Sequence, residues 1–166
     1  AGIAMAGNPY ARLVNARLEF GYKLLPDPCP SRELAEKNAK NAMAQVDFFR
    51  KNGVRVVNMS WGDSAKSIEG QLELCNIGKT PEERGTIARE LFDLTKRGLQ
   101  AAFASAPEIL FVAAAGNSNA DAAFEEAIPS DIVLPTLLTV GDEDAEDVLE
   151  VAVYCPTCAA MEFGWP

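Results

Sequence analysis

Short apolar runs of strand length alternate along this chain with longer segments of helical periodicity. Three of these runs predict buried strands, at residues 54–59, 109–115 and 137–141. A further strand is expected at residues 11–20, where polar and apolar residues alternate over part of the length. Residues 118–135 carry two prolines and are expected to form a long loop.

The first predicted helix begins after Ser31, a favourable N-cap residue, and continues to about Asn52. Gly53 is expected to end it. Its apolar residues recur at helical spacing and so share one face, formed by Ala35, Ala39, Ala42, Met43, Val46 and Phe49.

A second helix is predicted from the sequence Thr80-Pro81-Glu82-Glu83, which has the form of a capping box with proline at the first helical position. This helix extends to about Ser105, because Pro107 bars its continuation. Its buried stripe is expected to consist of Ile87, Leu91, Leu94, Leu99 and Phe103. The preceding residues 63–79 are less regular and favour a helix weakened by Gly70, followed by a turn.

The order strand, helix, strand, helix, strand, loop, strand is typical of right-handed βαβ crossovers. It predicts an α/β protein with three layers, in which a mostly parallel sheet carries helices on both faces. The order of the strands within the sheet does not follow from the sequence.

Length and composition fit one globular domain, with 166 residues, of which 48% are hydrophobic. The formal charge of −9 and the absence of a basic patch argue against a nucleic-acid partner. No apolar stretch approaches the length that spans a bilayer, so no membrane partner is expected. The chain opens with AGIAMAGNPY, without an initiator Met or a basic segment, which indicates a piece of a longer chain. Its oligomeric state and compartment are not predicted.

The cysteines indicate neither a metal site nor a redox site. Cys29 and Cys75 are isolated in the sequence, while Cys155 and Cys158 form the motif CPTC. A zinc site needs four ligands, and the chain offers one Cys pair and no histidine. A thioredoxin-type pair would open a helix after a strand, whereas this pair lies in the C-terminal tail.

Asn117 is the most informative candidate for chemistry, because the apolar run at residues 111–115 stops at Gly116 and Asn117. In open α/β sheets, ligands bind beyond the carboxyl ends of the strands. A neutral amide placed there can stabilise an oxyanion, although Gly-Asn is also common in ordinary turns. The chain has no histidine and therefore lacks the usual base for a serine nucleophile.

Several stretches in order resemble the subtilisin-like serine proteases (subtilases). They are AGIA at residues 1–4, NPYARLVNARL at 8–18, VRVVNMSWG at 54–62, FVAAAGNSN at 111–119 and LPTLLTVGDED at 134–144. The resemblance implies that residues 1–144 form part of a subtilisin-like catalytic domain, with an incomplete fold. Residues 145–166 match nothing in the family pattern and are expected to be a divergent tail. Family members are usually secreted or extracellular.

The resemblance also implies a site for a polypeptide substrate. Asn117 would donate its amide to the oxyanion of the tetrahedral intermediate. One substrate-binding segment would consist of Ser60, Trp61 and Gly62, and the wall of the pocket for the P1 side chain would consist of Ala114, Ala115 and Gly116. The alternative for Trp61 is simple packing under residues 63–79. The resemblance further places Ile128-Pro129 where a cis peptide bond is a possibility.

The triad of the family cannot be assigned to this chain. Its Asp and His motifs would lie before Ala1, and its Ser motif would follow residues 137–141, where the chain does not contain it. The expected protein is therefore an endopeptidase fragment that is inactive alone, and the alternative is a catalytically degenerate α/β binding module. The family often carries structural calcium, but Asp121, Asp142 and Asp144 lack a recognisable ligand spacing, so no metal or other cofactor is assigned.

Two further enzyme classes fit less well. The sequence around Ser60 has the strand-Ser-turn look of a nucleophile elbow, but an α/β-hydrolase needs a histidine downstream of that serine. A nucleotide-binding protein would carry a glycine-rich phosphate loop after a strand, and this chain has none.

Overall fold

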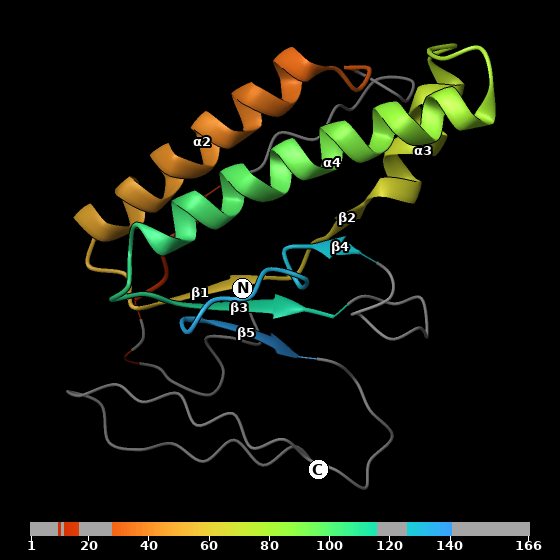
Figure 1. Ribbon diagram of the computed structural model, residues 1–166. Coiled ribbons are helices and arrows are strands. Elements are labelled where there is room, and N and C mark those ends of the chain that lie inside the picture. Colours follow the sequence, from red (N-terminus) through yellow and green to blue (C-terminus); the bar gives the residue numbers. More distant parts are fainter. Residues whose placement is uncertain (1–9, 11, 17–27, 116–125, 141–166) are drawn as a thin grey trace, which may run out of the picture.

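The computed structural model describes residues 10, 12–16, 28–115 and 126–140 (Figure 1). The elements in chain order are α2 (Arg32–Lys51), β1 (Val56–Met59), β2 (Asp63–Ser64), α3 (Ala65–Leu74), α4 (Pro81–Ala104), β3 (Leu110–Ala114), β4 (Ala127–Ile128) and β5 (Leu137–Val140). None of the helices in this part of the chain is both long and apolar enough to cross a bilayer.

The two long helices begin at the residues that the sequence predicts. The Ser31 side chain accepts a hydrogen bond from the Leu34 amide at 3.1 Å and caps α2. The Thr80 side chain accepts one from the Glu83 amide at 3.2 Å and caps α4. The Glu83 carboxylate reaches back to the Lys79 amide at 2.7 Å, one residue before the position expected in a capping box.

Strands β1, β3 and β5 form a parallel sheet in the order β1-β3-β5, so β3 is central. This arrangement confirms the α/β class and all three strongly apolar strands. Residues 12–16 have no regular secondary structure, so the strand expected at 11–20 is wrong over that part, and its other residues lie outside the described ones.

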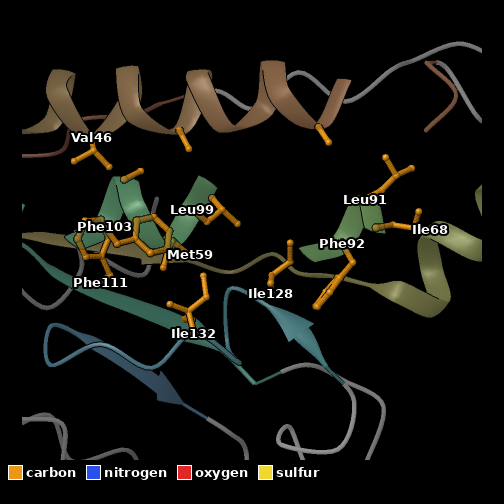
Figure 2. Close-up of a cluster of buried hydrophobic side chains, with 14 of the residues drawn as sticks. Val46, Met59, Ile68, Leu91, Phe92, Leu99, Phe103, Phe111, Ile128 and Ile132 are labelled. Carbon is orange, nitrogen blue, oxygen red and sulfur yellow. The ribbon is translucent and has the colours of Figure 1, made fainter. Parts of the chain in front are cut away.

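The described helices all lie on one side of the parallel sheet (Figure 1). Within the described residues, the expectation of helices on both faces is therefore not met. The core lies between this helical layer and the sheet, where Phe103 of α4 stacks on Phe111 of β3 with ring centroids 4.5 Å apart (Figure 2). Val46 of α2 is 2% exposed and covers this core on the side of the helices.

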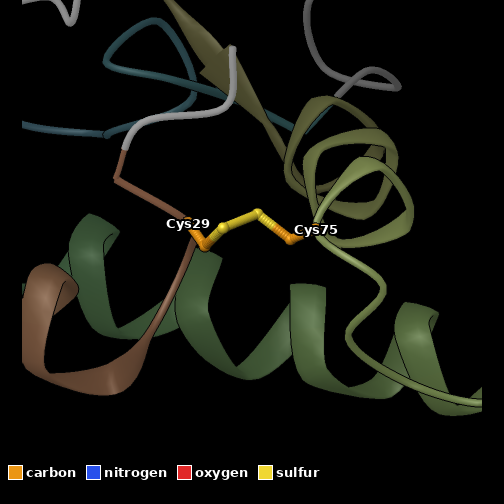
Figure 3. Close-up of a disulfide and its surroundings, with 2 residues drawn as sticks. All are labelled: Cys29 and Cys75. Carbon is orange, nitrogen blue, oxygen red and sulfur yellow. A yellow bond between two sulfur atoms is a disulfide. The ribbon is translucent and has the colours of Figure 1, made fainter. Parts of the chain in front are cut away.

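The sequence did not reveal two small features of the fold. Strand β2 pairs antiparallel with β4, and β4 lies within residues 118–135, the segment expected to be a loop. Cys29 and Cys75, which looked isolated, form a disulfide that joins the chain just before α2 to the C-terminal end of α3 (Figure 3). These cysteines are 46 residues apart, and no local pattern connects them.

Candidate functional site

The carboxyl edge of the sheet brings two predicted segments together. Strands β1 and β3 are adjacent and parallel, and their register pairs Met59 with Ala113. The next residues along the chain are Ser60, which follows the last residue of β1, and Ala114, which ends β3, so residues 60–62 and 114–115 lie at the same edge of the sheet. The Ala115 amide donates a hydrogen bond to the Val140 carbonyl at 2.8 Å, which fixes the end of β3 against β5.

Ser60 is exposed at this edge, and its hydroxyl accepts a hydrogen bond from the Asn58 amide at 2.9 Å. An amide that donates to the hydroxyl does not remove its proton. The chain has no histidine, which is the most usual base for a nucleophilic serine.

Trp61 is half-buried and packs against the hydrophobic core. Together with side chains from β1, α2, α4 and β3, it lines a cavity of about 120 Å³. Its neighbours around this cavity include Phe49, Met59 and Phe103. The indole thus contacts the core from the edge of the sheet, and one side of it borders an apolar hollow.

Gly62 is exposed and lies against β4. A Cβ atom at this position would lie 3.2 Å from the carbonyl oxygen of Ile128, which is closer than most side chains tolerate. The neighbouring Ile128-Pro129 peptide bond is cis. Glycine therefore permits the close approach between residues 60–62 and β4.

Residues 126–131 form a side of this region that the sequence did not indicate. Glu126 has a positive φ of 47°, which is unusual for a residue with a side chain. The Ser130 hydroxyl donates to the Ala127 carbonyl at 3.0 Å, and the Thr139 hydroxyl donates to the Ser130 carbonyl at 2.9 Å. Only Pro129, at a position where the family resemblance allowed a cis bond, drew attention to this segment in the sequence.

Some of the predicted site residues and ligands lie outside the described residues. These are Gly116, Asn117, Asp121, Asp142, Asp144, Cys155 and Cys158. Ala115 is the last described residue before Asn117. In the described part of the chain, no cluster of three or more Cys, Asp or Glu side chains is arranged to hold a metal ion.

Hydrogen bonds lower the pKa of two carboxylates, Glu108 and Glu82. The Arg50 guanidinium donates a hydrogen bond to the Glu108 carboxylate at 2.8 Å, and this contact lowers the pKa of Glu108. Glu108 precedes β3, so this ion pair lies at the amino edge of the sheet. In the first turn of α4, hydrogen bonds from its own backbone and from Thr80 lower the pKa of Glu82. Both features stabilise the fold and take no part in the candidate site.

The parallel sheet and the two segments at its carboxyl edge define an α/β protein with a candidate binding site at the position usual for that class. The chain belongs to the subtilase family (peptidase S8), whose family model matches residues 1–164. Membership implies a serine-type peptidase that acts on polypeptides. No curated protein matches the chain, and no solved structure matches it.

Proposed function

We propose that this chain supplies the substrate-binding segments and the oxyanion-stabilising amide of a serine endopeptidase. In this proposal residues 1–144 belong to the catalytic domain, and the Asp, His and Ser of the triad come from outside the chain. Residues 145–166 form a tail that diverges from the family pattern, although the family model extends to residue 164. The observation that carries the proposal is that residues 60–62 and 114–115 lie at the carboxyl ends of the adjacent parallel strands β1 and β3.

Residues 60–62 are suited to bind an extended peptide. Ser60 and Gly62 are exposed, and a peptide can add to such a segment through main-chain hydrogen bonds. At the end of the adjacent strand β3, Ala114 and the residues that follow it in the sequence, Ala115 and Gly116, have small side chains or none, and we expect them to leave room for a bulky P1 side chain. Trp61 would form a wall of the same groove.

Asn117 follows two residues after Ala115 and would therefore lie near the bound carbonyl group. Its amide donates hydrogen bonds without adding a net charge or a titrating proton. For subtilisin itself, removal of the equivalent oxyanion-hole Asn reduces kcat by about 10²–10³. We expect a loss of the same order for Asn117.

The test uses the full-length protein that contains this chain, assayed on a peptide substrate. Asn117→Ala should lower kcat by about 10²–10³ and leave KM nearly unchanged, because the amide acts in the transition state. Asn38→Ala, an exposed asparagine on α2, is the matched control and should retain full activity. An unchanged kcat for Asn117→Ala would refute the assigned role.

The absence of histidine from the chain also favours a second candidate, a degenerate binding module. The isolated 166-residue chain should not hydrolyse peptides under either proposal. The two differ in the full-length protein: an endopeptidase cleaves the peptide, whereas a degenerate module binds it and leaves it intact.

A further inference from the structure

Helix α4 holds residues 126–131 through charged side chains that lie on one face of the helix. Arg89 forms an ion pair with Glu126, and Lys96 forms one with Asp131, with its Nζ 2.6 Å from the Asp131 Oδ2. Because Arg89 and Lys96 are seven residues apart, they lie two turns from each other on the same face. The helix thus contacts both ends of the segment.

Apolar packing joins the same two elements between these ion pairs. Phe92 of α4 and Ile128 of β4 are each 1% exposed and belong to the same buried cluster (Figure 2). Phe92 lies between Arg89 and Lys96 along the helix. Ion pairs to α4 therefore hold the two ends of residues 126–131, and buried apolar packing against α4 holds the middle.

The pair of Lys96 and Asp131 is the more enclosed of the two. Its side chains are 28% and 23% exposed, and it is the one ion pair of the described residues in which both partners are less than a third exposed. Solvent screens such a pair less than a surface pair. By contrast, the Arg32–Glu90 pair on the outer surface has exposures of 65% and 63%.

The anchored segment bears directly on the candidate site. Strand β4 pairs with β2, and the register places Ile128 opposite Asp63. The Ile128 carbonyl also lies against Gly62, where a Cβ atom would come within 3.2 Å of the carbonyl oxygen. A shift of residues 126–131 would therefore move residues 60–62.

We propose that Lys96 and Asp131 are positioning residues for substrate binding, which hold β4 against α4 and thereby fix residues 60–62 in the geometry that a peptide requires. The inference rests on the proposed function of residues 60–62. We expect neither Lys96 nor Asp131 to touch the substrate. Their effect is transmitted through Ile128 to Gly62.

The first experiment measures amide hydrogen exchange in the full-length protein. Lys96→Met keeps the aliphatic stem and removes the charge, so exchange at β2 and β4 should become about tenfold faster. Lys96→Arg keeps the ion pair and should restore slow exchange. Arg32→Met removes the same charge from an exposed pair and serves as the matched control, with no change at β2 or β4.

The second experiment measures peptide hydrolysis by the same variants. Lys96→Met should raise KM several-fold with kcat largely retained, since it disturbs binding and leaves the reacting groups in place. Unchanged exchange at β2 and β4 would overturn the positioning role and leave the proposed function standing. Faster exchange with unchanged KM would instead show that residues 60–62 do not bind the substrate, and both proposals would then fail.

Discussion

Helices α2 and α4 cross at a point where only glycine fits, and this contact gives a sharp prediction. A Cβ atom on Gly98 of α4 would lie 2.3 Å from the Cβ and 2.9 Å from the Cα of Ala39 on α2. Ordinary carbon–carbon contacts are about 3.5–4.0 Å, so the helices would have to separate by about 1 Å. Gly98→Ala should therefore strain a closely packed part of the core.

The magnitude follows from two opposing terms. Replacing glycine by alanine within a helix stabilises it by roughly 0.5–1 kcal/mol. Overpacking typically costs about 1–3 kcal/mol. For Gly98→Ala we expect the second term to win, with a net loss of about 1–2 kcal/mol in the free energy of unfolding.

Gly85 provides the matched control, because it lies on the same helix and a Cβ there would meet nothing within 4 Å. Gly85→Ala should raise the free energy of unfolding by about 0.5–1 kcal/mol. The two variants should thus differ by about 2 kcal/mol, or about 4–8 °C in Tm for a chain of this size.

Urea and thermal unfolding of the chain, followed by far-UV circular dichroism, measure this difference. Both variants change the same residue type in the same helix, so intrinsic helix propensity cancels in the comparison. If Gly98→Ala is as stable as Gly85→Ala, then α2 and α4 do not approach as closely as described, and the packing argument is refuted.

Three further predictions concern the disulfide, the core and the amino edge of the sheet. Replacing both Cys29 and Cys75 by serine should lower the free energy of unfolding by about 4 kcal/mol in the chain-entropy model, because the bridge closes a loop of 46 residues. Urea unfolding with and without reductant tests this, and a loss below about 1 kcal/mol would contradict it. Phe111→Ala should lower the free energy of unfolding, measured by thermal unfolding, by about 3–5 kcal/mol, since Phe111 is fully buried. A loss as small as that of a surface substitution would contradict the buried position of Phe111. Arg50→Met should raise the pKa of Glu108 in an NMR titration. The lowered pKa stabilises the fold above the ordinary carboxyl pKa, and this contribution disappears as the pH falls through the lowered value; an unchanged pKa in the variant would exclude the ion pair as its cause.

The sequence predicted the helices well because their ends depend on local chemistry. Ser31 and Thr80 cap their helices through contacts three residues away, which a linear pattern can indicate. The buried stripe of α4 was predicted less completely. Leu91, Leu99 and Phe103 are buried as expected, but Phe92 is buried as well, because the helix packs against β4 in addition to α2 and the sheet.

Features that join distant parts of the chain could not be predicted. Strands β2 and β4 have two residues each, too few to show an alternating pattern. The contact between Lys96 and Asp131 spans 35 residues and depends on how α4 crosses the sheet. At the candidate site, the placement of residues 60–62 and 114–115 follows from βαβ topology, whereas their suggested roles come from the family resemblance.

The bond between Cys29 and Cys75 turns part of the chain into a covalent ring that encloses α2, β1, residues 60–62 and α3. A single cut anywhere within that ring opens the backbone without releasing a fragment. The halves of a nicked molecule would stay tethered and separate on a denaturing gel only after reduction. In a protein of a proteolytic family, such a tether would keep residues 60–62 attached to the rest of the molecule after a cut within the ring.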